Sequence, residues 1–313
     1  MQSNKNSSGS RKLKAYINLA LAMFISGSAV VVNKMMVTAL PVFLAAELGI
    51  LAGLMILIPF TFGVLKCEWR YDVRTYLVLF LQAFCGVFLY RIFTFIGLKS
   101  TTAVSSGLIT SAAPVLVLLF AWVLLKERIT FRQLIAVGCT MAAILLVNLS
   151  AVTATHGYGS IGGNLLIMAA VVCEALFSIL SKVKCRPVTA ICKTTIIVID
   201  AFLLLLPLSI RDALGFDFST ISMRTVLCIV YYGVFVTFLS YVFWFWGIEN
   251  TRAGDAAPFT SIVPISSMLL SVVLLHERLL PLHIISLIFV IAGIWISCSE
   301  GRGRANQMHK KST

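Results

Sequence analysis

Charged residues are scarce in this chain. Asp, Glu, Lys and Arg make up only 12% of its 313 residues, whereas 59% are hydrophobic. In a typical soluble domain roughly a quarter of the residues are charged, and the interior has no room for this much apolar surface. The composition therefore predicts that the lipid bilayer is the main solvent of the protein.

Signatures of metal, cofactor and nucleotide chemistry are also missing. The sequence has no HExxH motif, no cluster of His and Cys at metal-ligand spacing and no Walker motif. We therefore predict no metal and no cofactor, and we expect neither an enzyme nor an ATP-driven pump. A channel is also disfavoured, because the chain has no filter sequence and no ring of charged residues. The eight cysteines are scattered singly, which predicts reduced packing residues.

Apolar runs long enough to cross a bilayer as helices follow one another along the whole chain. They lie near 15–37, 41–65, 75–97, 102–125, 130–149, 163–183, 190–210, 224–246, 252–275 and 281–298. The sequence thus predicts an all-α integral membrane protein with ten transmembrane helices. The expected parts are a cytoplasmic tail (1–14), a first five-helix unit (15–149), a Gly-rich linker (150–162), a second five-helix unit (163–298) and a second cytoplasmic tail (299–313).

One stretch of the sequence occurs twice. Residues 98–128 read LKSTTAVSSGLITSAAPVLVLLFAWVLLKER, and residues 248–278 read IENTRAGDAAPFTSIVPISSMLLSVVLLHER; the two align without a gap. The alignment extends to the preceding helix at the same offset, and to the first two helices of each half at an offset two residues shorter. Equivalent pairs include Arg91 and Tyr241, Thr94 and Trp244, Gly97 and Gly247, Pro114 and Pro264, and Glu127 and Glu277.

The basic residues predict the orientation of the chain in the membrane. They give a net charge of +13, but they form no patch with interleaved aromatics, so we expect no nucleic-acid partner. With a cytoplasmic N-terminus, all but six of the 25 Lys and Arg lie inside, as cytoplasmic loops require. The six exceptions are Lys34, Arg91, Lys99, Arg211, Arg224 and Arg278. Because each half holds five helices, the second copy must be inverted, which is typical of secondary transporters.

The doubled pattern resembles the drug/metabolite transporter superfamily, and in particular its EamA-type members. The resemblance is carried by two Pro-containing helices, which end in LLKER and LLHER, and by the GLKSTTA and GIENTRA junctions that precede them. The resemblance covers nearly the whole chain. It implies two inverted five-helix EamA repeats in the cell membrane, around a central cavity walled mainly by helices 1, 3, 4, 6, 8 and 9.

The same resemblance implies secondary active transport, often export of amino acids or related metabolites. Other members carry nucleotide sugars, phosphorylated sugars or drugs, so multidrug efflux and exchange of phosphorylated metabolites stay open as alternatives. Members commonly carry an arginine in the outer half of the second helix, where this chain reads LAAELG with Glu47. A small-molecule substrate is the expected partner, and the sequence leaves a monomer and a homodimer open.

Ionisable residues inside apolar runs are the first candidates for function, because each costs about 3 kcal/mol or more in the bilayer core. Arg91 is the foremost of them, since its guanidinium can bind a carboxylate or phosphate with two hydrogen bonds. Tyr90 and Thr94 lie within one helical turn of it. The alternative is that Arg91 forms a buried ion pair with one of the acids.

The acids Glu174, Asp200 and Glu47 complete this set. Glu174 either exchanges a proton with the cavity during transport or is the partner of Arg91. Asp200 lies among aliphatic residues, which favours a packing role. Glu47 is expected near the surface as a solvated or gating residue.

The repeat adds an aromatic wall and two kinks to the predicted site. Tyr241 and Trp244 share a helix face and lie opposite Arg91 and Thr94, which predicts a substrate with both a carboxylate and an apolar part. Pro114 and Pro264 each remove one intrahelical hydrogen bond, so we expect kinked helices beside the cavity. A GxxxG pair in the second helix is interpreted as packing within the chain.

Overall fold

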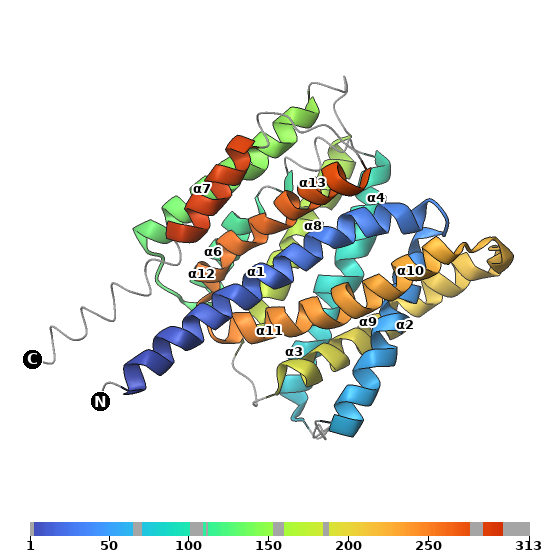
Figure 1. Ribbon diagram of the computed structural model, residues 1–313, viewed down its shortest axis with the longest axis horizontal. Coiled ribbons are helices and arrows are strands. Elements are labelled where there is room, and N and C mark those ends of the chain that lie inside the picture. Colours follow the sequence, from blue (N-terminus) through green and yellow to red (C-terminus); the bar gives the residue numbers. More distant parts are fainter. Residues whose placement is uncertain are drawn as a thin grey trace, which may run out of the picture.

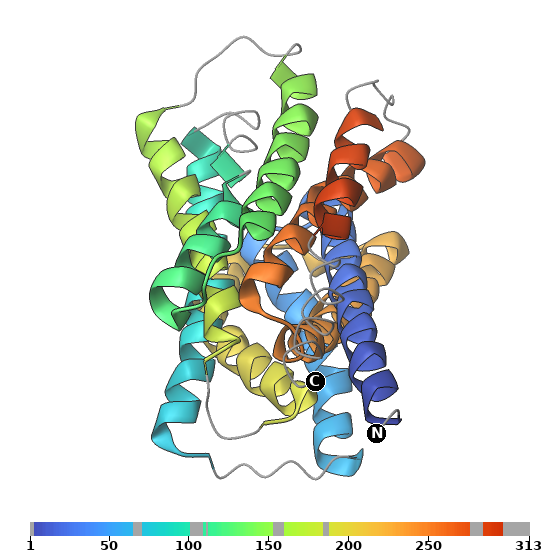
Figure 2. The same cartoon turned by 90° about the vertical axis from the view of Figure 1, so that its left-hand side faces the viewer.

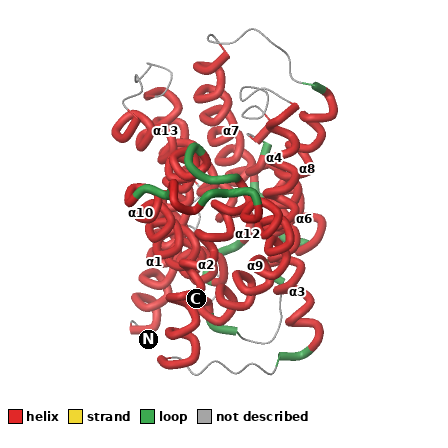
Figure 3. The backbone as a smooth tube through the Cα atoms, turned by 90° about the vertical axis from the view of Figure 1, so that its right-hand side faces the viewer, coloured by secondary structure: helices red, strands yellow, loops and turns green. Residues whose placement is uncertain are grey.

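The structure of the protein is a computed structural model that describes most of the chain. The described ranges are 3–64, 71–100, 109–110, 112–152, 160–183, 188–275 and 284–296. Within these ranges the regular elements are all helices, and Figure 3 shows no strand among them. Figures 1 and 2 show the helices packed as a bundle, with α1 and the α3–α4 helix on opposite sides in the view of Figure 2.

The first half of the chain forms the helices that correspond to the first five predicted spans. They are α1 (Ser3–Val37), α2 (Val42–Pro59) continued by the π-helical η1 (Phe60–Val64), α3 (Val73–Ala83) continued by η2 (Phe84–Leu89) and α4 (Tyr90–Ser100), α6 (Ala113–Leu125) and α7 (Phe131–Val152). Most of the fourth predicted span before α6, residues 101–108 and Ser111, lies outside the described residues.

The second half repeats this order. Its helices are α8 (Ile161–Leu180), α9 (Ala190–Leu214), the 3₁₀ turn η3 (Phe218–Thr220), α10 (Met223–Tyr231) continued by the π-helical η4 (Tyr232–Ser240) and α11 (Tyr241–Glu249), α12 (Ala253–Ala256) continued by the 3₁₀ segment η5 (Ala257–Ser261) and α13 (Ile262–Leu275), and a last helix over Ile284–Ile296. Six helical segments in the described ranges are long and apolar enough to cross a membrane, and Ala113–Leu125, Phe131–Leu146 and Ile284–Ile296 are shorter apolar helices.

The first helix extends beyond the apolar run into the polar residues before it. The sequence predicts a polar tail up to residue 14, and α1 already starts at Ser3, while the span apolar enough to cross a membrane is Lys12–Val37. No proline interrupts 3–14, and extending an existing helix costs far less than starting one, so the apolar segment propagates its helix into the polar residues. Of the linker predicted at 150–162, residues 153–159 lie outside the described residues, as does the predicted tail at 299–313.

The repeat is visible in how the helices pack. α1 packs against α11 and α13, and α8 packs in the same way against α4 and α6. A Cβ atom on Gly97 would lie 2.8 Å from Cδ1 of Ile167 on α8, and one on Gly247 would lie 2.7 Å from Cγ of Leu19 on α1. Ile167 and Leu19 are themselves equivalent in the repeat. Both contacts need glycine because each helix pair approaches too closely for a side chain, so the repeat extends from the sequence to its packing.

The GxxxG pair of α2 serves packing within the chain, as the sequence predicted. A Cβ atom on Gly49 would lie 2.6 Å from the ring of Tyr232, and one on Gly53 would lie 2.5 Å from the side chain of Thr237. Both partners belong to η4, and the hydroxyl of Thr237 donates to the carbonyl of Gly49 at 3.3 Å. These glycines thus let the second and eighth spans approach closely at the centre of the bundle.

The two prolines predicted as kinks both lie in the first turn of a helix. Pro114 is the second residue of α6, where a missing N–H leaves no hydrogen bond unmade. Pro264 is the third residue of α13, and the 3₁₀ segment η5 precedes that helix. A kink at Pro264 stays a prediction. A kink at Pro114 stays a prediction, because the residues before Ile109 lie outside the described part.

One cysteine differs from the expectation of reduced thiols. Cys85, Cys139, Cys173 and Cys228 are free. Cys192, in the first turn of α9, is disulfide-bonded, so the prediction is wrong for this residue. A disulfide requires two Cα atoms within about 7 Å of each other. Scattered cysteines can meet that condition once the loops bring helix ends together, and spacing along the chain does not reveal it.

Candidate substrate-binding cavity

A central cavity of about 460 Å³ lies between the two halves of the bundle. Its described wall comes from α1, α2, α4, α8, α9, α11 and the helical segments next to them. Helices 1, 3, 4, 6, 8 and 9 were expected there. Ile50 on α2 and Val198 and Ala201 on α9 show that helices 2 and 7 also line it. The described residues of helix 4 contribute no lining residue.

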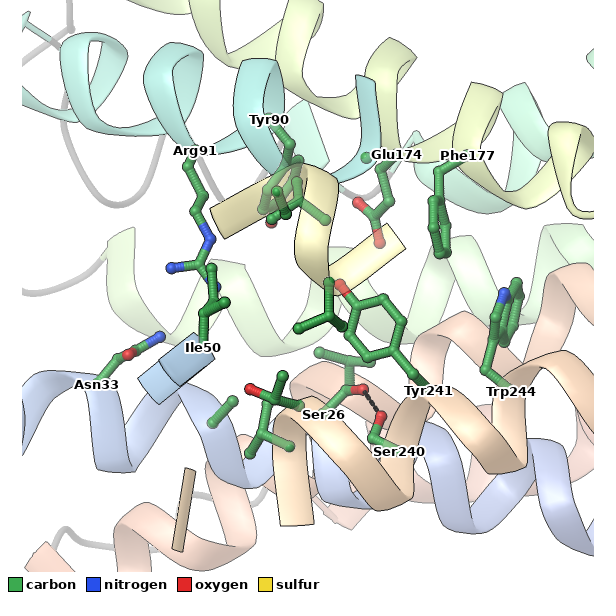
Figure 4. Close-up of a pocket in the computed structure, with 18 of the residues that line it drawn as sticks. Ser26, Asn33, Ile50, Tyr90, Arg91, Glu174, Phe177, Ser240, Tyr241 and Trp244 are labelled. Carbon is green, nitrogen blue, oxygen red and sulfur yellow. Dashed lines mark hydrogen bonds between the residues drawn. The ribbon is translucent and has the colours of Figure 1, made fainter. Parts of the chain in front are cut away.

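The residues proposed from the sequence as the binding site come together around this cavity. Figure 4 shows Tyr90, Arg91, Glu174, Tyr241 and Trp244 pointing into the space between the helices, and Thr94 also lines it. Tyr90, Arg91 and Thr94 come from α4, Glu174 from α8, and Tyr241 and Trp244 from α11. Four of these six positions form two equivalent pairs of the repeat, so one cavity gathers groups that lie about 150 residues apart.

A short π-helical segment precedes each of the helices α4 and α11 that line the cavity. η2 ends immediately before Tyr90 and η4 ends immediately before Tyr241. A π-helical turn holds an extra residue, so it rotates the helix that follows and re-aims its side chains; such turns are frequent at functional sites. The sequence analysis missed both segments, and the one available signal was the glycine inside each, Gly86 and Gly233.

Arg91 makes a hydrogen bond with a tyrosine and not with an acid. Its Nη2 donates to the hydroxyl of Tyr232 at 3.1 Å. No acid in the described part of the chain forms an ion pair with Arg91 within 4.0 Å. The structure therefore favours the alternative in which the guanidinium is free for a ligand. Tyr232 was not among the predicted site residues.

Glu174 presents its carboxylate to the cavity from α8, which packs beside α4. In Figure 4 the carboxylate points toward the hydroxyl of Tyr241, and both residues line the cavity. Among the described residues its side chain has no hydrogen-bond partner, while its backbone carbonyl accepts from Ser178 at 3.2 Å. An acid at the cavity surface without a fixed partner can gain and lose a proton as the cavity contents change.

Stacked aromatic rings form part of the cavity wall. Trp244 is only 4% exposed and stacks on Phe177 with centroids 6.4 Å apart and planes at 20°. Tyr241 meets the same Phe177 ring edge-on at 6.0 Å. The indole Nε1 of Trp244 is buried and has no hydrogen-bond partner in the described part of the chain. The wall therefore offers apolar ring surface to the cavity.

Small polar side chains complete the lining, and the sequence analysis did not single them out. The hydroxyls of Ser26 on α1 and Ser240 on η4 form a hydrogen bond of 2.8 Å, and Figure 4 marks this bond with a dashed line. The polar lining residues outside the predicted set are Ser26, Asn33, Ser178, Tyr232, Thr237, Ser240 and Thr260. Hydroxyls and amides in apolar helices are a usable signal, because in lipid they are normally placed toward protein or a cavity.

The other two buried acids lie outside the lining. The side chain of Asp200 is 5% exposed and accepts a hydrogen bond from the hydroxyl of Tyr76 at 3.2 Å, which joins α9 to α3 and supports a packing role. Glu47 was expected near the surface, but it is also 5% exposed. That prediction is wrong because the N-terminal half of α2 is covered by α9, α10 and η4, which the apolar pattern of α2 alone does not show.

Polar contacts join the two halves of the chain at the start of α12. The carboxylate of Glu127 accepts from the backbone N–H groups of Ala253 and Gly254, both at 3.3 Å. The side-chain amide of Gln133 donates to Asp255 at 2.7 Å. Glu127 belongs to the LLKER ending of the repeat, so this motif holds the junction between the eighth and ninth spans.

The EamA-like transporter family matches residues 13–149 and 161–299, one match for each half of the chain. The protein belongs to this family. The fold-class prediction, two EamA repeats in an all-helical membrane protein, is thereby confirmed. Among the described residues of this EamA-like transporter, no group of three or more His, Cys, Asp and Glu is placed to hold a metal ion.

Relatives of this EamA-like transporter are named as transporters. The uncharacterized transporter YetK of Bacillus subtilis is 34% identical over 288 residues, which are 92% of this chain and 87% of YetK. The uncharacterized transporter YyaM of the same organism is 28% identical over 72% of this chain and 74% of its own. A Salmonella typhimurium protein named probable amino-acid metabolite efflux pump is 24% identical over 55% of this chain and 59% of its own.

A solved crystal structure shares the fold of this EamA-like transporter. It is 19% identical in sequence, covers 92% of this chain and 98% of its own, and has a TM-score of 0.74. At this identity the likeness concerns the backbone architecture alone.

Proposed function

We propose that this EamA-like transporter is a secondary active transporter that exports small metabolites such as amino acids. The single observation that carries the proposal is the cavity, where a fixed cation, a carboxylate and an aromatic wall face one another. We place the protein in the cell membrane with both termini in the cytoplasm. Alternating access would expose the cavity to one side at a time, with the two halves moving against each other.

The lining favours a substrate with a carboxylate and an apolar part. Arg91 has one hydrogen bond to Tyr232, so most of its five N–H donors remain for a ligand, and two of them match the two oxygens of a carboxylate. The apolar part of the substrate would pack on Trp244 and Phe177. A small zwitterion such as an amino acid satisfies both walls, whereas Arg91 would repel a hydrophobic cation.

Glu174 is the proposed proton-coupling group. It lies on the cavity surface, so it is within reach of both substrate and water, and it has no fixed partner among the described residues. Glu174 would take up a proton from one side of the membrane and release it to the other as the two halves alternate, so that the proton gradient drives transport. This arrangement would couple export to proton entry without nucleotide hydrolysis.

Export of phosphorylated metabolites or of drugs is the competing proposal on the same fold. Among the described lining residues, Arg91 and Glu174 carry the formal charges. A phosphate group carries about two negative charges at neutral pH, so one arginine beside a carboxylate would neutralise it poorly. A cationic drug would have to bind beside Arg91. The charge balance of the cavity therefore favours the singly charged carboxylate of an amino acid.

Uptake into inverted membrane vesicles tests the proposal directly. A panel should contain amino acids, the same compounds without the carboxylate, phosphorylated sugars and nucleotide sugars. We expect saturable, gradient-dependent uptake of carboxylate compounds alone, and saturation distinguishes a carrier from a channel. Uptake of carboxylate-free cations that is unaffected by Arg91→Ala at normal expression would overturn the assignment.

A further inference from the structure

Glu47 is a buried acid whose carboxylate has no partner. The side chain is 5% exposed, and neither Oε1 nor Oε2 accepts a hydrogen bond from any residue that the structure describes. It does not line the central cavity. An ionised carboxylate is strongly disfavoured in such a place unless an opposite charge lies near, so this residue calls for a physical explanation.

The cation that acts on Glu47 is Arg91, on α4. Phe43 on α2 and Phe95 on α4 meet edge-on with ring centroids 5.7 Å apart. Glu47 lies one turn after Phe43, and Arg91 lies one turn before Phe95, each on the same face of its helix as that ring. Because α2 and α4 run in opposite directions (Figure 1), both displacements lead to the same depth in the bundle.

Two further observations agree with this placement. The charge of Arg91 acts electrostatically on the Glu47 carboxylate, although the two are too far apart for an ion pair. Ile50, one turn after Glu47, lines the central cavity beside Arg91 (Figure 4). Glu47 thus lies behind the cavity wall at the level of the guanidinium, where it feels the charge of Arg91 but not the cavity contents directly.

The other polar groups around α2 are neutral or already engaged. η4 contributes Tyr232, whose ring covers Gly49 and whose hydroxyl accepts from Arg91. α9 contributes Asp212, which accepts from the N–H groups of Phe43 and Leu44 at the start of α2, at 2.9 and 3.4 Å. α10 contributes Cys228 and Tyr231 to the same apolar cluster, and α1 contributes Asn33 to the cavity wall. Arg91 is thus the described cation that faces Glu47.

We propose that Glu47 is the titratable counter-charge of Arg91 and thereby determines whether the cavity accepts a carboxylate. Protonated Glu47 leaves the guanidinium uncompensated and available to the ligand. Ionised Glu47 competes with the ligand for it. The inference rests on the proposed role of Arg91 in binding a carboxylate.

The proton balance of this competition is one for one. When a carboxylate binds Arg91, Glu47 takes one proton from water, and when the carboxylate leaves, Glu47 returns the proton to water. Where Glu47 is ionised in the empty protein, the site counted together with the ligand carboxylate then has zero net charge both with and without ligand, which avoids leaving an uncompensated charge inside the membrane. Carboxylate affinity must consequently fall as pH rises through the ionisation of Glu47.

Infrared spectroscopy on the purified full-length protein in lipid nanodiscs tests the pairing without any substrate. A protonated carboxyl group gives its own absorption band, and subtracting the spectrum of Glu47→Gln isolates the band of Glu47. We expect this band near neutral pH and its loss at higher pH. In Arg91→Gln the band should persist to a pH about one unit higher or more, because the cation that favours the ionised form is gone.

Matched variants make this outcome specific. Arg91→Lys keeps the charge, so the band should disappear near the wild-type pH. Asp200→Asn removes a different buried acid and should leave the Glu47 band in place. The proposal is overturned if Glu47→Gln removes no band at any pH, or if the band disappears at the same pH in wild type and Arg91→Gln. Should Arg91→Gln fail to fold, Arg91→Met replaces it, with thermal unfolding as the check.

Binding of a carboxylate from the transport panel gives the functional readout. Wild-type affinity should fall by up to about tenfold for each pH unit above the ionisation of Glu47, and in Glu47→Gln it should be constant within about twofold. If the panel yields no carboxylate ligand while the band still responds to Arg91, the proposed function fails and the pairing stands. If a carboxylate binds with the same pH dependence in Glu47→Gln, the inference alone fails.

Discussion

The helices α4 and α11 occupy equivalent places in the two halves and line the same cavity, yet they offer it different chemistry. Each follows a π-helical segment, and each packs through an equivalent glycine, Gly97 or Gly247, onto the first helix of the other half. α4 contributes a cation and hydroxyls from Tyr90, Arg91 and Thr94. α11 contributes the aromatic rings of Tyr241 and Trp244.

This difference shows that the two repeats share their backbone geometry, whereas their side chains determine the chemistry of the cavity. Close helix contacts tolerate few residue types, because a Cβ atom at Gly97 or Gly247 would overlap a neighbour. Positions that face the cavity have no such packing constraint, so an arginine and a tyrosine can occupy equivalent places. A symmetric frame can in this way hold a ligand whose two ends differ, such as an amino acid.

The comparison depends first on the two halves being inverted in the membrane. Single cysteines placed at 126 and 276, in a background without the native cysteines, should label from opposite sides, since these positions are equivalent in repeats of opposite orientation. We expect an all-or-none difference, with 126 reached from the cytoplasm and 276 from outside. Equal access of both positions to an impermeant external reagent would contradict the inverted arrangement.

Removing the cation from the α4 wall should have the next largest effect. Arg91→Ala loses two charge-assisted hydrogen bonds of about 1.5–3 kcal/mol each, so transport of a carboxylate substrate should fall roughly 100-fold or more. Arg91→Lys keeps the charge but not the fork and should lose roughly tenfold. Arg211→Ala, at an exposed arginine away from the cavity, is the control; an Arg91→Ala protein as active as this control would rule out the α4 wall as the anion site.

The acid between the two walls is tested by its pH response. Glu174→Gln cannot exchange a proton, so transport at saturating substrate should lose its pH dependence while substrate affinity changes by no more than about twofold. The measurement is initial uptake across a pH series in vesicles. Asp200→Asn is the control for a buried acid outside the lining, and it should keep the wild-type profile. A wild-type profile in Glu174→Gln would reject coupling through this residue.

The smallest effect is expected from the aromatic wall. Trp244→Ala removes a stacked ring, an interaction of about 0.5–1.5 kcal/mol beyond the buried area, so preference among apolar side chains should shift by roughly three- to tenfold. Competition between amino acids of different side-chain size measures this shift. Trp246→Ala, on the same helix but outside the lining, should leave the order of preference unchanged. An unchanged order in Trp244→Ala would remove this wall from the specificity site.

The sequence by itself determined the helices, their repetition and most of the candidate site. Helix length, apolar runs and the placement of basic residues follow from the bilayer, which acts on each segment separately. Arg91, Glu174 and Trp244 were found for the same reason, since polar or aromatic groups at repeated positions of an apolar helix stand out without knowledge of their neighbours.

Only the tertiary structure decided which of these groups are covered and which are paired. The burial of Glu47, the hydrogen bond from Arg91 to Tyr232 and the disulfide at Cys192 each depend on a partner element distant in the sequence. The π-helical turns before Tyr90 and Tyr241 likewise reflect packing between helices. The residue pattern along one helix shows how apolar the environment of that helix is. Which neighbouring helix provides this environment depends on contacts between helices, and the pattern of a single helix does not contain them.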